Sequence, residues 1–347
     1  MDGPLRIEYE ARGVSVHVLP DVLHRISTIQ NLSHEVECLA QNIRDLSPDL
    51  VFVNTLLNFP SVLAAEKAGV PSIWNPRESE AWNIYFRFLP NPVAQQAIAA
   101  IGLPRKVVFV AEATRGVWKD FESLANFSVV ENSLDMNRFS KWLVRDKSAE
   151  RERLGWLADE VVFLCVGTLC ERKGQLDSLL ALQNFIDQLD VQIRLVFVGN
   201  SDNRYGKKIR EHALRFRKHK QIHIEFIPPI DDIGVYYLAA DVFLLCSRVE
   251  SCPRVILEAQ AFGLAIISTP VFGITEQIPN PQDARFYAPG DVRHLGSIML
   301  TLSRDHIERN RLSKCSIVHF SRKNDFNTMI ESYNKEIQDA CSGFQQP

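Results

Sequence analysis

The chain has 347 residues, of which 46% are hydrophobic and 23% charged, and its formal net charge is -3. These values are typical of a soluble globular protein with room for two domains, and they exclude a global attraction to nucleic acid or acidic membranes. No apolar run approaches the roughly 18 residues needed to cross a bilayer, and the amino terminus lacks the apolar core of a signal peptide. We therefore expect a cytoplasmic protein with no nucleic-acid partner.

The first part of the chain alternates predicted strands with helical stretches. Short apolar runs predict strands at residues 14–20, 49–55, 71–76, 106–112 and 127–133. The segment 60–69 between two of them has helical composition, so this part favours an α/β domain on a parallel sheet. The charged stretch 144–155 that follows is either a linker or a surface helix.

The alternation restarts after this stretch. Further strands are predicted at residues 161–168, 193–199, 222–227, 241–246 and 264–269. Residues 176–186 keep helical spacing, and the chain from Arg293 onward is helical in pattern. We expect two tandem doubly wound, Rossmann-like α/β domains with an interdomain cleft. The expected boundaries are a first domain at 1–143, a linker at 144–155, a second domain at 156–325, and a helix and tail at 326–347 that is free to pack back on the first domain.

Cysteine, histidine and glycine spacings argue against a metal or a bound cofactor. The seven cysteines and nine histidines form no C-x-x-C pair and no H-E-x-x-H motif, and no D-x-D pair occurs. Neither half has a G-x-G-x-x-G motif after its first strand, which disfavours a nicotinamide or flavin dinucleotide. We expect neither a metal nor a cofactor.

The stretch VESCPRVILEAQAFGLAIIST places two carboxylates, Glu250 and Glu258, among apolar and small residues. It predicts a helix with Pro253 at its first position and Ser251 or Cys252 as its cap. Glu250 then follows a strand, and Glu258 lies on the second helical turn. Open parallel sheets bind ligands at this edge, and a helix amino terminus suits a phosphate. The alternative is that Glu250 is merely favoured by the helix dipole and Glu258 is solvated.

Two basic segments leave similar alternatives. In GTLCERKG, Arg172 and Lys173 stand in the loop after the first strand of the second domain, where they either meet a phosphate or form a solvated turn. Residues 207–220 hold seven Lys or Arg against one Glu. This run either touches anionic lipid at the inner face of a membrane, as a peripheral contact, or forms the solvated face of a helix.

Together these motifs resemble the retaining glycosyltransferases of the GT-B fold, in the large family numbered 4. The family's G-R-L-x-x-x-K-G loop appears as GTLCERKG at 167–174, and its E-x7-E motif as ESCPRVILE at 250–258. The resemblance implies a metal-independent, hexosyltransferase-type enzyme of polysaccharide biosynthesis. Such an enzyme moves a sugar, with retention, from a nucleotide diphosphate sugar to a glycan, lipid-linked or small-molecule hydroxyl acceptor.

The resemblance also implies a role for each matching residue. Glu258 would accept hydrogen bonds from ribose hydroxyls, and Glu250 would contact the donor sugar. Lys173, helped by Arg172, would stabilise the charge that grows on the leaving diphosphate. The remaining implied contacts are Gly167, Thr168, Ser251, Cys252, Pro253 and Arg254 on the donor side, and Asn75, Arg77 and Glu78 on the acceptor side.

The sequence departs from the family pattern in three places. Thr168 replaces the family's loop Arg, and Arg77 and Glu78 stand near the position where many members have a His. The segment 10–20 resembles the family's first helix end and second strand, so the opening strand has no counterpart. Either the chain is a truncated form or LRIEY is recruited to the sheet. A non-catalytic protein that binds a sugar nucleotide or glycan through a degraded acceptor domain is therefore the rival interpretation.

Overall fold

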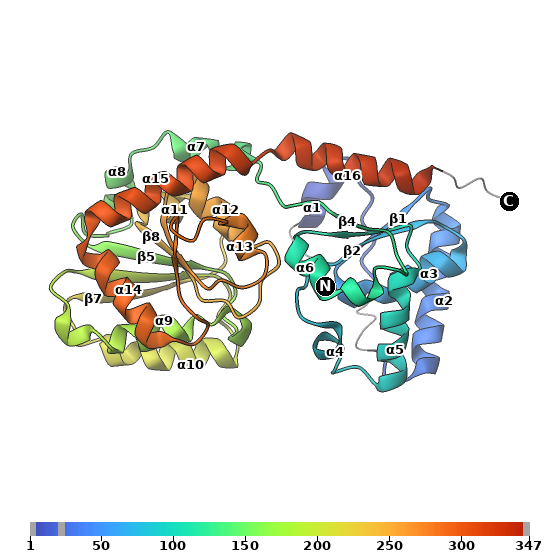
Figure 1. The fold of residues 1–347 in the computed structure, drawn as a ribbon, viewed down its shortest axis with the longest axis horizontal. Helices are drawn as coiled ribbons and strands as arrows, with labels where there is room; N and C mark the ends of the chain where they lie inside the picture. Colours follow the sequence, from blue (N-terminus) through green and yellow to red (C-terminus); the bar gives the residue numbers. More distant parts are fainter. Residues whose placement is uncertain (1–4, 20–24, 343–347) are drawn as a thin grey trace. The chain divides into compact units, whose positions relative to one another are not determined.

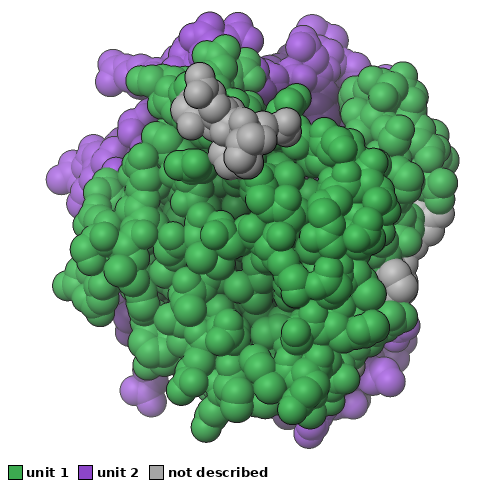
Figure 2. Space-filling view, turned by 90° about the vertical axis from the view of Figure 1, so that its right-hand side faces the viewer, with its two compact units in different colours: residues 1–110, 115–130, 332–347 green, residues 111–114, 131–331 purple. Residues whose placement is uncertain are grey.

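The computed structural model describes residues 5–19 and 25–342, which form two compact units (Figures 1 and 2). Unit 1 contains the described residues up to Val110 together with 115–130 and the chain from Ser332. Unit 2 contains 111–114 and 131–331. Each unit has its own parallel sheet, as expected for two tandem α/β domains.

Unit 1 is built on four parallel strands in the order β1-β2-β3-β4. The strands are β1 (Val51–Asn54), β2 (Ser72–Asn75), β3 (Lys106–Phe109) and β4 (Phe127–Val129). The helices are α1 (Leu5–Glu10), α2 (Ile29–Leu46), α3 (Phe59–Ala68), α4 (Trp82–Tyr85) and α5 (Asn91–Ala99). Helix α6 (Glu112–Val117) is divided, with residues 112–114 in unit 2 and 115–117 in unit 1. The last helix, α16 (Phe326–Cys341), belongs to unit 1 from Ser332 onward.

Large apolar side chains fill the core of unit 1. Phe59, Trp74, Phe109 and Trp118 are fully buried. The indole of Trp74 donates to the carbonyl of Thr55 at 2.8 Å, which satisfies its one polar group. A helix that packs on such a core needs apolar residues along one face only. Accordingly, α2 has 18 residues and buries only one face.

The predicted strand at 14–20 is wrong for its described part. Residues 14–19 are not a strand, Pro20 lies outside the described residues, and LRIEY lies in helix α1. Val14, Val18 and Leu19 are about half exposed. Their alternating apolar side chains therefore do not pack against a sheet or a core. Neither pairing with 49–55 nor recruitment of LRIEY as a strand occurs in the described residues, where β1 pairs with β2 alone.

Unit 2 has six parallel strands in the order β10-β9-β8-β5-β6-β7. They are β5 (Val161–Val166), β6 (Ile193–Val198), β7 (Ile222–Ile227), β8 (Val242–Leu245), β9 (Ala265–Ser268) and β10 (Arg285–Phe286). The helices are α7 (Ser140–Leu143), α8 (Lys147–Arg153), α9 (Leu176–Gln183), α10 (Arg204–Ala213), α11 (Gly234–Ala239), α12 (Arg254–Ala261), α13 (Ile274–Gln277), α14 (Val292–Arg304) and α15 (His306–Lys323).

Helices cover both faces of this sheet, so unit 2 is doubly wound. Helices α9, α10 and α14 pack on one face and α8, α11 and α12 on the other (Figure 1). Alternate strand residues supply the two cores: Phe163 and Leu195 face one, Leu164 and Val196 the other. The strand order reverses between β5 and β8, which makes their carboxyl ends the topological switch point.

The charged stretch 144–155 contains a helix that is joined to the sheet by buried charges. In α8, the Nε of Arg151 donates to the carbonyl of Ala239 at 2.8 Å, and its Nη2 lies 2.5 Å from a carboxylate oxygen of Asp241. Arg151 is only 7% exposed. Glu150 of the same helix is 5% exposed and pairs with Arg145 at 2.8 Å. One face of this helix is therefore part of the structure of unit 2.

Candidate functional site

The loops after β5 and β8 lie side by side because these strands are neighbours at the switch point. The backbone N–H of Arg248 donates to the carbonyl of Arg172 at 2.7 Å. In return, Nη1 of Arg172 donates to the carbonyl of Val249 at 2.8 Å. Two segments more than 70 residues apart in the sequence thereby form one wall, at the edge where open parallel sheets bind ligands.

Lys173 and Glu250 form an ion pair in this wall. Their Nζ and Oε1 atoms are 2.5 Å apart, and Nη1 of Arg172 lies 3.4 Å from the same oxygen. The hydroxyl of Ser247 also donates to Glu250, at 2.8 Å. Glu250 is 7% exposed and has three side-chain partners, so the helix dipole is not its only favourable interaction. The arrangement holds a cation in a fixed place where charge can develop on a ligand.

Gly174 allows the two loops to approach this closely. Its φ of +63° lies in the left-handed region, and a Cβ there would be 2.3 Å from the carbonyl oxygen of Cys246. This glycine matches the last position of the family motif, but the sequence alone does not show which residues it contacts. Its role is to let the backbone after Lys173 contact the backbone after β8.

Arg248 and Asp177 form a second ion pair, which the sequence did not predict. The guanidinium of Arg248 donates to both carboxylate oxygens of Asp177, at 2.7 and 2.9 Å. This bidentate pair joins the loop after β8 to the first turn of α9. No sequence spacing relates the two residues, because the contact depends on the adjacency of β5 and β8.

The amino terminus of α12 faces the same edge. Pro253 is the N-cap residue rather than the first helical residue, because its ψ of 118° leaves it extended, and no side chain caps the helix. The expectation that Ser251 or Cys252 serves as the cap is therefore wrong. Within residues 5–19 and 25–342 no side chain caps the start of α12, although the N–H of Ile256 donates to the carbonyl of Pro253 at 3.1 Å, and such an uncapped helix start suits an anion.

Glu258 lies on the second turn of α12, as predicted, but it is not solvated. It is 7% exposed, and the buried hydroxyl of Tyr237 donates to its Oε2 at 2.7 Å. Burial and the neighbouring Glu258 raise the pKa of Tyr237 well above its usual range, so the phenol stays a donor. Tyr237 was missed because its relation to Glu258 comes from the packing of α11 against α12.

The other predicted donor-side residues surround these groups. Thr168 is exposed and its carbonyl accepts from Gln175 at 3.0 Å. Cys252 is buried, and burial raises the pKa of its thiol to about 11, so it is a neutral thiol. Ser251 is also buried, whereas the side chain of Arg254 is exposed at the start of α12. Gly167 directly follows β5 and has a φ of +132°.

Gly273 closes the back of this loop. A Cβ there would lie 1.6 Å from the carbonyl oxygen of Ser251, so no other residue fits without a backbone shift. The following Glu276 accepts hydrogen bonds from the N–H groups of Glu112 and Ala113, at 2.8 and 2.6 Å. This carboxylate caps the start of helix α6.

The predicted acceptor-side residues lie in unit 1, at the carboxyl ends of β1 and β2. Glu78 accepts from the N–H groups of Leu56 and Arg77, both at 2.9 Å, and Nε of Arg77 donates to Asn54 at 2.8 Å. Asn75 is fully buried and donates to the carbonyl of Val108 at 2.5 Å. Its Oδ1 has no hydrogen-bond partner within residues 5–19 and 25–342.

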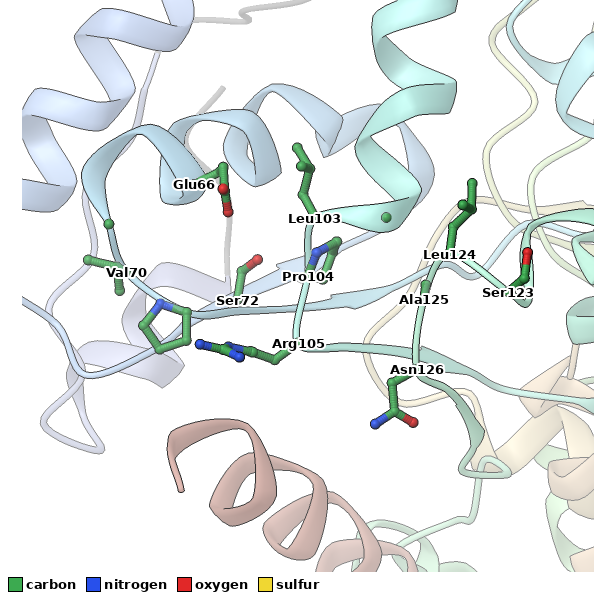
Figure 3. Close-up of a pocket in the computed structure, with 13 residues that line it drawn as sticks. Glu66, Val70, Ser72, Leu103, Pro104, Arg105, Ser123, Leu124, Ala125 and Asn126 are labelled. Atoms are coloured by element: carbon green, nitrogen blue, oxygen red, sulfur yellow. The ribbon is translucent and has the colours of Figure 1, made fainter. Parts of the chain in front are cut away.

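A hollow of about 720 Å³ lies elsewhere in unit 1 (Figure 3). Ser72, Arg105 and Asn126 line it, next to the amino-terminal ends of β2, β3 and β4. This is the edge opposite to the one where parallel sheets bind ligands, so we do not assign the candidate site to it. Within the described ranges, no three His, Cys, Asp or Glu side chains are grouped as metal ligands, and no helix there is long and apolar enough to cross a membrane.

Comparison with known protein families identifies the second half of the chain. Residues 146–317 match the family described as glycosyl transferases group 1. A curated relative from Corynebacterium glutamicum, a GDP-mannose-dependent mannosyltransferase of monoacylated phosphatidylinositol monomannoside, is 26% identical over 71% of this chain and 66% of its own length. The putative teichuronic acid glycosyltransferase TuaC of Bacillus subtilis is 26% identical over 67% of this chain and 56% of its own. The chain thus spans less than two thirds of these relatives.

Solved structures share the fold of the chain. HepE of Anabaena, in complex with UDP-glucose, superposes with a TM-score of 0.78 at 18% identity, covering 97% of this chain and 90% of that one. The sucrose-phosphate synthase of Thermosynechococcus elongatus gives a TM-score of 0.72 at 16% identity, over 89% and 78%. The fold is the GT-B fold of two Rossmann-like domains, as predicted.

Proposed function

We propose, from the premise that residues 146–317 belong to the group 1 family of glycosyl transferases, that this chain is a retaining glycosyltransferase using a nucleotide diphosphate sugar. The observation that carries the proposal is the Lys173–Glu250 pair at the switch point of unit 2, next to the uncapped start of α12. A cation, a carboxylate and a helix amino terminus without a side-chain cap lie at one edge, and these groups match the parts of such a donor.

The donor's parts would each meet a group of matching chemistry. The diphosphate would lie against the first turn of α12 and the cations of Arg172 and Lys173. Glu258, oriented by Tyr237, would accept hydrogen bonds from the ribose hydroxyls. Glu250 would accept from a hydroxyl of the sugar while it keeps Lys173 in place.

In the transfer step, the bond between the anomeric carbon and the diphosphate oxygen breaks, and the acceptor oxygen bonds to the same carbon on the same face. The acceptor's proton passes to the leaving phosphate oxygen, so no protein base is required. Negative charge grows on the diphosphate, where Lys173 and Arg172 stabilise it without the help of a metal ion. Asn75, Arg77 and Glu78 are our proposed contacts on the acceptor side.

The names of the similar proteins suggest where to search for the donor. HepE was solved with UDP-glucose and the Corynebacterium relative is GDP-mannose-dependent, so UDP and GDP sugars are the first candidates. A glycan or lipid-linked hydroxyl compound is the proposed acceptor class, since one relative is named as a mannosyltransferase of a phosphatidylinositol mannoside and the other as a putative glycosyltransferase of teichuronic acid biosynthesis.

The test is a panel of UDP, GDP and other sugar nucleotides, first in thermal stabilisation and then in transfer to hydroxyl acceptors. We expect one donor to stabilise the protein and to release its diphosphate in a reaction that depends on Lys173. Retention is tested by NMR of the product's anomeric proton. Donor binding with no transfer to any acceptor would instead favour the non-catalytic binding protein, and stabilisation by none of the donors would contradict both.

A further inference from the structure

A second strongly charged feature lies outside the candidate site, on helix α10 and the residues that lead from it to β7. We define it as the basic face: Lys207, Lys208, Arg210, Arg215, Arg217, Lys218 and Lys220. All seven are exposed. With Glu211 as the one acid among residues 207–220, this segment carries a charge of +6 in a chain of net charge -3. The remainder of the chain is therefore acidic.

The cations of the basic face are not used inside the protein as ion pairs. Arg194, on the adjacent strand β6, pairs with Glu160 and Glu225. In the described part of the chain, by contrast, none of the seven residues of the basic face forms an ion pair with a carboxylate. Burial together with Arg215 and Lys208 lowers the pKa of His212, as expected in a positive potential.

A hollow of about 450 Å³ opens within this face. Its walls include Arg210, Leu214 and Arg217 on the helix side and Phe226 on β7, the edge strand of the sheet. The guanidinium of Arg210 lies 4.7 Å above the ring of Phe226, and Arg210 also donates to the hydroxyl of Ser201. Arg210 and Arg217 thus stand beside an apolar floor, and Arg210 is held in place by its two contacts.

An apolar side chain stands among these cations on the outside. Leu214, in the turn that continues α10 (Leu214–Phe216), is 58% exposed. A basic surface with an exposed leucine and an amphiphilic hollow combines the two terms that hold a helix at an interface, electrostatic attraction to anionic headgroups and burial of apolar area.

We infer that the basic face binds the surface of an anionic lipid bilayer, with headgroup phosphates on its cations and Leu214 in the interface. Single-stranded nucleic acid fits less well, because it is held by stacking on exposed aromatic rings. Here Phe216 is 2% exposed and Phe226 lies beneath Arg210. The inference does not depend on the chemistry of transfer.

Hydrogen bonds connect helix α10, which carries part of the basic face, to the loop after β5 in the candidate site. Asn203 caps α10 by accepting from the N–H of Gly206 at 2.8 Å, and its amide donates to the carbonyl of Leu169 at 2.8 Å. Leu169 lies in the loop between β5 and Lys173. The bilayer would therefore hold this loop in one orientation to the surface.

The test is co-sedimentation of the full chain with vesicles, either of phosphatidylcholine alone or of an equal mixture with phosphatidylglycerol. We expect binding to the mixed vesicles only, and weaker binding as salt rises. The variant R215E/K218E should bind them at least about tenfold more weakly. The control K314E/R322E makes the same change of charge on exposed residues of α15, which packs on α12 and β9, and should change binding less than about twofold.

Three results would overturn the inference. They are equal losses in the two charge-reversal variants, equal binding to uncharged vesicles, and tighter binding to single-stranded DNA than to mixed vesicles at the same salt. Thermal unfolding and stabilisation by nucleotide report whether each variant is folded. If R215E/K218E does not fold, R215Q/K218Q replaces it, with K314Q/R322Q as its control, and the same outcomes apply. Leu214→Ser should weaken the binding that remains at high salt.

Discussion

Lys173 and Glu250 form an ion pair of 2.5 Å at the candidate site, and this contact fixes the position of the lysine cation. A lysine held by a buried carboxylate keeps its position without a ligand. When negative charge develops nearby, the cation needs no reorganisation to stabilise it.

Lys173→Ala should leave the fold intact and slow transfer about a hundred- to thousandfold, since one preorganised contact is typically worth roughly 2.7 to 4 kcal/mol of barrier. Single-turnover rates with saturating donor measure this loss. Lys314→Ala, which removes an exposed lysine on α15, is the control and should not change the rate. A Lys173→Ala enzyme with the normal rate would show that Lys173 has no catalytic role.

The two carboxylates should separate in their effect on ligands. Glu258→Ala should weaken both the bare nucleoside diphosphate and the sugar nucleotide, because Glu258 is assigned to the ribose. Glu250→Ala should weaken mainly the sugar nucleotide. Calorimetry with both ligands distinguishes the roles, and equal losses in the two variants would contradict the assignment.

Tyr237 gives a finer test of the same assignment. Tyr237→Phe removes only the hydroxyl that donates to Glu258, so binding of the bare diphosphate should weaken about fivefold, which corresponds to roughly 1 kcal/mol for one hydrogen bond. The neighbouring Tyr236→Phe is the matched control. If both variants bind equally well, the hydroxyl does not orient Glu258 for the nucleotide.

At the scale of elements, the site depends on how closely the loops after β5 and β8 approach. Gly174→Ala should destabilise unit 2 and weaken donor binding, because its Cβ would lie 2.3 Å from the carbonyl oxygen of Cys246. Gly155→Ala is a matched control: its φ of +69° imposes the same backbone strain, but nothing lies within 4 Å of the added Cβ.

Both variants carry the same backbone strain, so the difference between their free energies of unfolding measures the steric clash at Gly174 alone. We expect Gly174→Ala to lower the free energy of unfolding by roughly 1 to 3 kcal/mol more than Gly155→Ala, and to weaken donor binding where Gly155→Ala does not. Urea unfolding and calorimetry measure the two effects. Equal destabilisation by the two variants would mean that the loops can move apart at no cost.

Helix α8 is held to the sheet by a charge cluster that should make stability depend on pH. Burial opposes the ionised form of Asp241, but Lys147 and Arg151 outweigh it and lower the pKa of this carboxyl below 3.8. A carboxyl with a depressed folded-state pKa contributes stability above its unfolded pKa, and this contribution is lost as pH falls through the folded value.

Stability should therefore fall as pH drops below about 4, with part of the slope due to Asp241. In Asp241→Asn, the free energy of unfolding should be lower at neutral pH, and the acid slope should be shallower than in the unmodified protein. Urea unfolding at a series of pH values tests this. An acid slope that is unchanged in Asp241→Asn would contradict the assignment.

At the scale of the whole molecule, every proposed donor contact lies in unit 2. Hydrogen exchange with and without the donor nucleotide should therefore show increased protection in the loops 167–175 and 247–254, and no change in the strands β1 to β4. Equal protection of the two sheets would show that donor binding also involves unit 1. Peptide-level mass spectrometry resolves the two regions.

Local sequence patterns were sufficient for most of the fold. The nine strands from β1 to β9 were all predicted from short, mainly apolar runs. Every residue of β2, β8 and β9 is buried, because a parallel strand covered on both faces has no solvent side, whereas β1 and β4 are partly exposed. The prediction of a strand at 14–20 used the same reasoning and was wrong. Apolar and polar residues alternate there, but no neighbouring strand pairs with the described residues 14–19. The strand β10 was not predicted. It has only two residues, which is too short for an apolar run or an alternation to be recognised in the sequence.

The sequence by itself determined the order of the strands β1 to β9, the position of Glu258 on the second turn of α12, and the match of residues 146–317 to the family of group 1 glycosyl transferases. Those properties are encoded in short spacings along the chain. Only the tertiary structure decided that Lys173 meets Glu250, that Arg248 clamps Asp177 and that Tyr237 orients Glu258. The physical reason is that these contacts follow from the adjacency of β5 and β8 and the packing of α11 on the same face as α12, and no periodicity in the chain records which strands become neighbours.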